Sequence, residues 1–157
     1  AAELMVKQGS GHIINIGSLA GVAPVAGISL YSASKFALRG FSLATALELR
    51  DHGVHVSVVS MDVVDTPMLD PQYEMKESAV SFSGKRILRI EEVEAAILKC
   101  MQKKRVEVLI PAGRGWMSKL ANILPSLAQP IYRSMVKKGR KRQAEKVEQR
   151  KAAGLMD

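Results

Sequence analysis

Residues 11–41 read GHIINIGSLAGVAPVAGISLYSASKFALRGF, in which a β-branched apolar run precedes a segment with helical periodicity. The run HIINIG, residues 12–17, is almost continuously apolar, as in a strand covered on both faces of a parallel sheet. Apolar residues then recur at the spacing of one helix face, and the segment ends at a glycine, residue 53. These apolar positions are Leu30, Ala33, Ala37, Phe41, Ala44 and Leu47. We therefore expect a strand at 12–17 and a helix over about 30–50.

The same alternation continues toward the C-terminus. VHVSVVS (54–60) and VEVLIP (106–111) have the composition of buried strands, and RIEEVEAAILKCMQKK (89–104) has acidic residues early and basic residues late, as the helix dipole favours. Parallel strands joined by right-handed crossovers are the usual arrangement for such an order. The sequence predicts an α/β fold with part of a doubly wound parallel sheet in residues 1–112, and a separate, mostly helical extension in residues 113–157.

Composition narrows the class of protein. The 157 residues are 47% hydrophobic and 24% charged, as in soluble globular proteins. No apolar stretch approaches the roughly 20 residues of a membrane span. The net charge of +8 is concentrated in residues 137–151, which hold eight basic and two acidic residues. This basic run lacks interleaved aromatic residues, so nucleic acid is not the expected partner.

The cysteine and the histidines are not expected to take part in chemistry. Cys100 is the only cysteine, which rules out a disulfide framework and favours a reducing, cytoplasmic location; we expect a buried, inert thiol rather than a reactive one. His12, His52 and His55 do not lie at metal-ligand spacing with Cys100 or with carboxylates. We therefore expect solvated histidines and no metal site.

Four polar side chains are predicted to meet at one edge of the sheet. Ligands of doubly wound sheets bind at the carboxyl ends of the strands. Ser18 directly follows the first strand, Tyr31 and Lys35 open the returning helix, and Thr66 comes just after the second strand. The topology therefore brings two hydroxyls, a phenol and an ammonium toward one rim.

The Tyr-x-x-x-Lys spacing suits proton transfer, because residues four apart share a helix face. A phenol with the reference pKa of about 10 must gain roughly 4 kcal/mol of preference for its anion to act near pH 7. An ammonium about 4 Å away supplies about 4 kcal/mol at an effective dielectric near 20. Each residue alone also has a simpler interpretation: Lys35 as a surface cation, Ser18 as a turn residue, and Thr66-Pro67 as a helix N-cap.

The order and spacing of these residues resemble a known family. GHIINIGSLAG followed by YSASKFALRGF is similar to the central segment of the short-chain dehydrogenase/reductase family, in which a serine ends the strand and the Tyr-x-x-x-Lys begins thirteen residues later, the spacing of Ser18 and Tyr31. The resemblance covers about residues 1–112. It implies a Rossmann-like sheet, NAD or NADP as cofactor, and hydride transfer between the nicotinamide and a hydroxyl or ketone substrate.

The resemblance also implies a role for each site residue. Tyr31 would be the catalytic acid/base, Lys35 would support it and bind the nicotinamide ribose, and Ser18 would polarise the substrate oxygen. Val64 and Thr66 would belong to the cofactor-binding loop. Residues 67–84 would form a mobile segment that covers the substrate, and the methionines and leucine in it hint at a lipophilic alcohol or ketone.

The sequence departs from the family pattern in two ways. Where the family usually has Pro-Gly after the second strand, this chain has Met61-Asp62. Asp62 could crowd the nicotinamide, or it could be a harmless turn substitution. The glycine-rich phosphate loop and the family's asparagine are not found in residues 1–157. We therefore expect this chain by itself to bind cofactor poorly and to lack turnover.

The expected partners involve the helix at 30–50 and the extension. By resemblance, the small residues of this helix pack against a second subunit in a homodimer or homotetramer, whereas core packing is the simpler expectation for Phe36, Phe41 and Leu47. An apolar stripe in 114–136, interrupted by prolines, precedes the basic run. The residues of this stripe are Trp116, Leu120, Ile123, Leu124, Leu127, Ile131 and Met135.

This extension has two interpretations. It is either a helical lid over the cleft or an interfacial anchor, within residues 114–151, for an anionic membrane. The second interpretation also fits an alternative function, in which the chain is a non-catalytic relative that binds a membrane or a partner.

Overall fold

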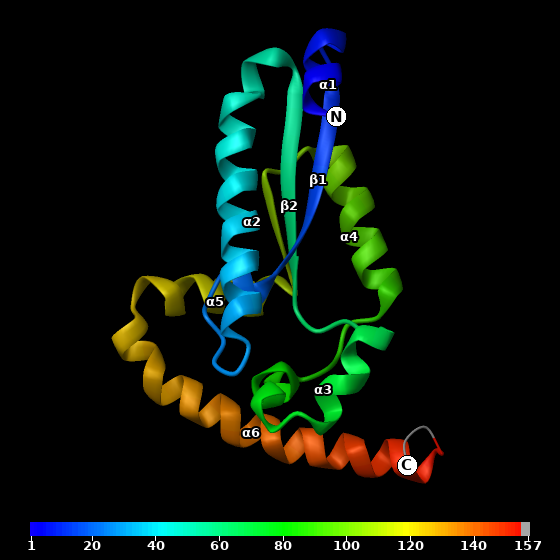
Figure 1. The fold of residues 1–157 in the computed structure, drawn as a ribbon, viewed down its shortest axis with the longest axis vertical. Helices are drawn as coiled ribbons and strands as arrows, with labels where there is room; N and C mark the ends of the chain where they lie inside the picture. Colours follow the sequence, from blue (N-terminus) through cyan, green and yellow to red (C-terminus); the bar gives the residue numbers. More distant parts are fainter. Residues whose placement is uncertain (155–157) are drawn as a thin grey trace.

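The computed structural model describes residues 1–154, apart from the side chain of Leu127; the end of the predicted extension, residues 155–157, lies outside the described residues. Three parallel strands form one sheet in the order β1-β2-β3: β1 Gly11–Ser18, β2 Val54–Met61 and β3 Glu107–Ile110 (Figure 1). All three strands predicted from the sequence are confirmed, and β3 is shorter by one residue at each end. Ser18 pairs with Met61, and Met61 with Ile110, so the three carboxyl ends meet at one edge.

Two long helices flank the sheet on opposite sides, which confirms the doubly wound arrangement (Figure 1). The helices are α2, Ser29–Glu48, and α4, Ile90–Lys103. A short helix, α1 (Ala2–Gln8), leads into β1, and 3-10 turns follow β1 (η1, Leu19–Gly21) and α2 (η2, Arg50–His52). The valines of β2 form the centre of the sheet and are almost completely buried: Val54, Val56, Val58 and Val59.

The apolar stripe of α2 faces away from the sheet. Phe41 is 63% exposed and Leu47 is 75% exposed, so the expectation that these side chains pack in the core is wrong. The face that packs inward carries small residues, among them Ser42, whose hydroxyl accepts a hydrogen bond from Asn15 Nδ2 on β1 (2.8 Å). Small side chains let the helix approach the strands closely, so that the large apolar residues remain on the outer surface.

Helical segments surround the carboxyl edge of the sheet. After β2 come η3 (Pro67–Leu69), α3 (Asp70–Glu74) and η4 (Lys76–Ser83). After β3 come α5 (Ala112–Ile123) and the 28-residue α6 (Pro125–Ala152), which passes beneath α3 and η4 (Figure 1). Among the residues that the structure describes, none of the helices has the length and apolarity needed to cross a membrane.

Helix α6 is fastened to the segment between β2 and α4. The buried side chain of Gln143 donates from Nε2 to three carbonyls at the end of α3, at 2.7 to 3.1 Å. Gly139 permits the closest approach, because a Cβ there would lie 1.8 Å from the carbonyl oxygen of Ala79 in η4. Val147 of α6 packs against the apolar cluster formed by Leu69, Tyr73 and Phe82. The second half of the extension is therefore a packing element as well as a carrier of charge.

We expect Gly139→Ala to lower the free energy of unfolding by about 1–3 kcal/mol, because the new methyl group meets a backbone carbonyl that cannot move without displacing η4. Gly113→Ala is the matched control, since nothing lies within 4 Å of a Cβ at that helical position. Urea denaturation of both variants measures the difference. Equal stability of the two variants would show that α6 does not pack as closely on η4 as described.

Candidate active site

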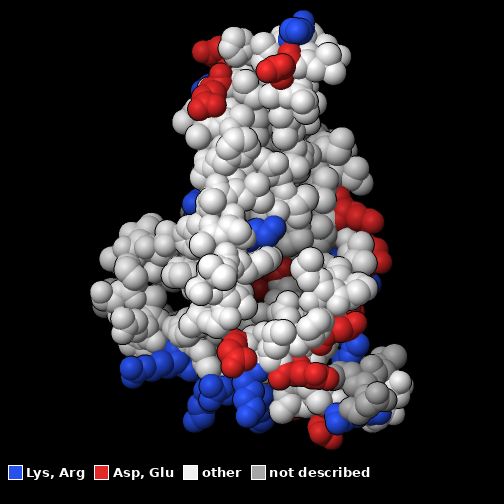
Figure 2. Space-filling view, in the orientation of Figure 1, with Lys and Arg blue, Asp and Glu red and all other residues white. Residues whose placement is uncertain are grey.

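An open cleft of about 1600 Å³ lies at the carboxyl edge of the sheet, and the molecular surface is hollowed near the centre of the face in Figure 2. All five predicted site residues line this cleft: Ser18, Tyr31, Lys35, Val64 and Thr66. The strand ends, the start of α2 and the segment after β2 form one side of it, and α5 and α6 form the other.

Ser18 is the last residue of β1 and the N-cap of η1. Its Oγ accepts a hydrogen bond from the backbone N–H of Ala20 (3.1 Å), which leaves the hydroxyl proton free to be donated into the cleft. The next turn lies tightly against α2, since a Cβ on Gly21 would be 2.4 Å from the carbonyl oxygen of Lys35. This close approach fixes the position of Ser18 relative to the helix that carries the tyrosine and the lysine.

Tyr31 and Lys35 occupy the first turns of α2. The Lys35 ammonium donates to the carbonyl oxygen of Ile16 (3.2 Å) and lies 5.6 Å from the centre of the Tyr31 ring. The Tyr31 side chain is partly exposed, at 41%, where it meets the cleft. No hydrogen bond within residues 1–154 joins Ser18, Tyr31 and Lys35 directly, so the cleft is what the three side chains share.

The loop after β2 carries Val64 and Thr66 to the same cleft. Backbone hydrogen bonds to Leu88 hold it: Leu88 N–H donates to Val63 O (2.9 Å) and Asp65 N–H donates to Leu88 O (2.8 Å). Thr66 precedes Pro67 at the start of η3, the N-cap position that the Thr-Pro pair predicts. Its hydroxyl makes only a long contact of 3.5 Å with Val64 O and remains free for another partner.

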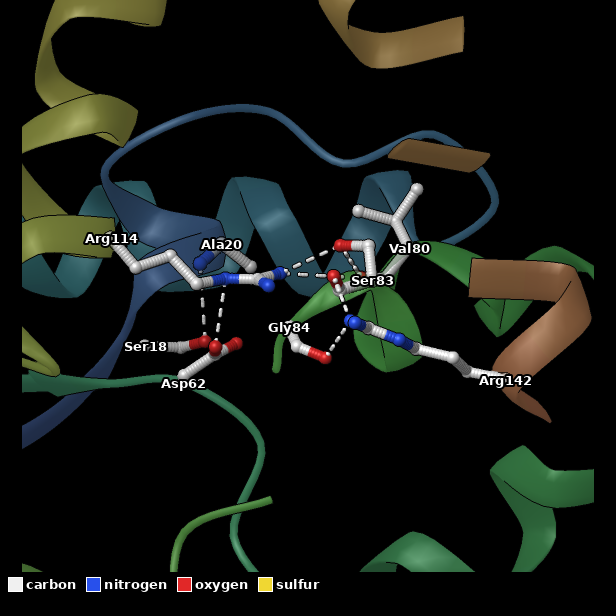
Figure 3. A network of polar contacts seen from close by, with 8 residues as sticks. All are labelled: Ser18, Ala20, Asp62, Val80, Ser83, Gly84, Arg114 and Arg142. Atoms are coloured by element: carbon white, nitrogen blue, oxygen red, sulfur yellow. Dashed lines mark hydrogen bonds and ion pairs between the residues drawn. The ribbon is translucent and has the colours of Figure 1, made fainter. Parts of the chain in front are cut away.

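Asp62 has a partner that the sequence did not reveal. It directly follows the residue that pairs with Ser18 in the sheet, and its carboxylate forms an ion pair with Arg114 Nε of α5 at 2.7 Å (Figure 3). Burial raises the pKa of the Asp62 carboxyl, and the positive charge of Arg114 opposes that rise. The departure from the family pattern therefore places no unpaired carboxylate in the cleft.

Arg114 also connects the sheet edge with the helical segments beyond it. Its Nη2 atom donates to Ser83 Oγ (3.0 Å) and to Val80 O (3.3 Å) of η4. Arg142 of α6 reaches the same place and donates to the carbonyl oxygens of Ser83 (2.9 Å) and Gly84 (Figure 3). We define the Arg114 network as Asp62, Ser83, Arg114 and Arg142.

A second set of ion pairs fixes α5 against the sheet. Glu107 of β3 contacts Arg39 of α2 at 2.7 Å and Lys119 of α5 at 2.5 Å. Burial raises the pKa of the Glu107 carboxyl, but the two cationic partners outweigh this influence and hold that pKa below its usual range. Helices α2 and α5, which both contribute to the lining of the cleft, are thus tied to the same strand.

We expected His12 to be solvated, but the structure gives its side chain partners within the protein. Its Nε2 atom lies 2.7 Å from Ser57 Oγ, and its ring stacks edge-on with His55 at 6.0 Å. Burial lowers the pKa of His12, with smaller influences from His55 and Lys104.

Cys100 is 1% exposed, which confirms the expected burial. The described part of the chain contains no group of three or more His, Cys, Asp or Glu side chains placed to hold a metal ion.

Comparison with known proteins identifies the family. Residues 1–77 match the model of the short chain dehydrogenases. A 3-alpha-(or 20-beta)-hydroxysteroid dehydrogenase of Mycobacterium tuberculosis is 44% identical over 66 residues, which are 42% of this chain and 25% of that protein. A 2,5-dichloro-2,5-cyclohexadiene-1,4-diol dehydrogenase of Sphingobium indicum is 47% identical over 64 residues, or 41% of this chain and 26% of that protein. Residues 1–77 of this chain therefore belong to the short-chain dehydrogenase family.

Solved structures agree with this fold. A short-chain dehydrogenase from Sphingobium yanoikuyae in complex with NADPH has a TM-score of 0.63 at 24% identity, covering 82% of this chain and 48% of its own. A bulky-bulky ketone specific alcohol dehydrogenase from Comamonas testosteroni has a TM-score of 0.54 at 26% identity, covering 83% and 44%. The match spans about a quarter of the length of the curated relatives and a little under half of these structures.

We expect Arg114→Met to lower the free energy of unfolding by about 3 kcal/mol at pH 7.5, because it leaves the carboxylate of Asp62 buried and unpaired. The deficit should shrink as the pH falls toward 5. Without the positive charge of Arg114, burial alone acts on Asp62 and raises its pKa in the folded state. As the pH falls, the folded protein therefore binds a proton at a higher pH than the unfolded chain does, and the penalty is relieved. Urea denaturation at both pH values measures this change.

Two further variants test the cause of this effect. Asp62→Asn in the Arg114→Met background should recover part of the lost stability at pH 7.5 and remove most of the pH dependence. Arg133→Met, at an exposed arginine of α6, is the matched control and should change stability by less than about 0.5 kcal/mol. A pH-independent deficit in Arg114→Met would contradict the role of a buried Asp62 charge.

Proposed function

We propose that the protein to which this chain belongs is an NAD(P)-dependent oxidoreductase that interconverts a hydroxyl and a ketone. The main support is that Ser18, Tyr31 and Lys35, in the part of the chain that matches the family, line one cleft at the carboxyl edge of the sheet. The names of two similar proteins, both dehydrogenases, agree with this reaction class.

Each side chain has a distinct part in the proposed chemistry. The Tyr31 phenol exchanges a proton with the substrate oxygen, and the Lys35 ammonium, 5.6 Å from the centre of the Tyr31 ring, places a positive charge on the same side of the helix. Ser18 donates its free hydroxyl proton to the same substrate oxygen, which stabilises negative charge there. The nicotinamide cofactor, when bound, gives or takes the hydride.

The donor chemistry of the cleft fits part of such a cofactor. Lys35 uses one of its three N–H donors on Ile16 O, which leaves donors for ribose hydroxyls. Thr66 keeps a hydroxyl for an amide group, and Val64 offers an apolar contact beside it. Because Arg114 pairs with Asp62, the position usually held by glycine presents a neutralised carboxylate. NAD and NADP are both compatible with these residues.

The walls of the cleft support a lipophilic substrate. Methionine and leucine side chains from η3, α5 and their neighbours line the cleft: Met68, Leu69, Met75, Met117 and Leu120. The hydroxysteroid and bulky-ketone names of two similar proteins agree with a large apolar substrate. Residues 67–84 contribute much of this lining, which supports their proposed role in covering the substrate.

We expect Tyr31→Phe in the full-length protein to lower kcat by at least about 100-fold, because the proton donor is lost while the shape of the ring is kept. Tyr73→Phe is the matched control: this tyrosine lies against Phe82 and Arg150, and it is not among the residues of the cleft. Steady-state rates with lipophilic ketones and alcohols measure both variants.

The same experiment distinguishes the alternative function. In a non-catalytic relative that binds a membrane or a partner, the wild-type protein shows no hydride transfer and Tyr31→Phe changes nothing. If Tyr31→Phe retained most of an authentic wild-type activity, the assignment of the acid/base would be wrong.

We also propose that α2 forms the interface of a homodimer or homotetramer in a cytoplasmic enzyme. The support is the outward apolar face, in which Leu30, Phe41 and Leu47 are 88%, 63% and 75% exposed, together with the exposed glycine at position 40. Burial of large apolar side chains in a second subunit is the ordinary reason for such a face.

We expect Phe41→Glu combined with Leu47→Glu to convert an oligomer of the full-length protein into monomers, because charges at the interface would have to be desolvated. Light scattering after size-exclusion chromatography measures the mass. Lys99→Glu combined with Lys103→Glu, on exposed positions of α4, controls for added charge. An unchanged mass in the α2 variant would place the interface elsewhere.

A further inference from the structure

The bend between α5 and α6 exposes a group of large apolar side chains. We define the elbow patch as Leu120, Ile123, Leu124 and Ile131, which are 62%, 70%, 53% and 54% exposed. These residues lie within two helical turns of the point where α5 ends and Pro125 begins α6. Single exposed apolar residues are common on protein surfaces, but such a group at the end of a protruding element indicates a binding surface.

A row of basic side chains follows the elbow patch along α6. We define the basic row as Arg133, Lys137, Lys138, Arg140 and Lys141, all of which are exposed. None of them forms an ion pair with a residue in the described part of the chain. Figure 2 shows that Lys and Arg side chains gather along the lower edge of the molecule, where α6 runs in Figure 1.

The packing of α6 fixes the direction in which this row points. Gly139 and Gln143, four residues apart, lie on the face that packs against η4 and α3. Lys137 and Lys141, also four residues apart, share another face, and both are exposed. The helix therefore cannot rotate to bury the basic row without losing its attachment to the rest of the protein.

We propose that the elbow patch and the basic row together dock the protein on an anionic lipid surface. Apolar side chains that enter the interface, followed by lysine and arginine at the level of the headgroups, are the two components of interfacial binding. A second copy of the chain fits less well, because a symmetric contact would bring two basic rows together. On this proposal the protein binds to the membrane surface and does not span the bilayer.

The docked face carries one entrance of the cleft. Three elbow-patch residues and one residue of the basic row line the cleft that holds Ser18, Tyr31 and Lys35: Leu120, Leu124, Ile131 and Arg133. An apolar molecule dissolved in the bilayer would therefore meet the cleft entrance at the membrane surface. Docking itself depends only on the exposed side chains, so it can be tested without a substrate.

The experiment is flotation of the full-length protein with vesicles of phosphatidylcholine, with and without 30 mol% phosphatidylglycerol. We expect binding to the anionic vesicles that weakens as the salt concentration rises. Lys137→Glu, Lys138→Glu and Lys141→Glu combined should weaken it by at least about tenfold, because each charge adds to the attraction. Ile123→Ser combined with Leu124→Ser should weaken it by a similar factor.

Lys7→Glu, Lys99→Glu and Lys103→Glu combined is the matched control, since it makes the same change in net charge at exposed lysines elsewhere and should leave binding within about twofold. Circular dichroism checks that every variant is folded. The proposal is overturned if the wild-type protein does not bind anionic vesicles. It is also overturned if the α6 or elbow variants bind as tightly as the wild type, or if the control variant weakens binding by the same factor. A lipid-free change in oligomer mass in the elbow variant would likewise overturn it, by showing that a second copy covers the patch.

Discussion

The largely buried ion pair between Asp62 and Arg114 is the constraint on which the arrangement of the cleft depends. A carboxylate at the end of β2, almost out of contact with water, is costly unless a cation lies beside it. The cation comes from α5, beyond the last strand, and the same guanidinium holds η4. The helical extension is consequently part of the structure around Ser18, and its start cannot move independently of the sheet edge.

Much of the fold was predictable because its signals are local. A strand or a helix shows its periodicity within a few residues, and the parallel order follows from the alternation of the two. The cleft positions of Ser18, Tyr31, Lys35 and Thr66 were predictable for a related reason: the carboxyl ends of parallel strands meet at one edge. The chemical roles of these residues remain a proposal that only activity measurements can test.

The features that were missed depend on contacts between distant parts of the chain. The sequence around Asp62 does not indicate that its partner lies in α5. Arg114 follows a strand, where an arginine is usually an ordinary surface residue. Helical spacing also could not tell which face of α2 points inward, since the apolar stripe faces outward and Ser42 faces the sheet. The basic run of α6 also contains side chains of two kinds: Arg142 donates to the carbonyl oxygens of Ser83 and Gly84, whereas Lys137 remains exposed.

The cleft is divided between two parts of the chain, and on the proposed function this division would separate chemistry from substrate selectivity. The family match ends at residue 77, and it contains the serine, the tyrosine and the lysine. The opposite wall is built from α5 and α6, where the apolar side chains and Arg133 lie. If the proposed function holds, substitutions in the matched part would change the proposed proton-transfer groups, whereas substitutions in α5 and α6 would change the shape and polarity of the opposite wall. The Arg114 network joins the two parts, so the lining of the cleft can vary along the extension while the position of Asp62 beside Ser18 is kept.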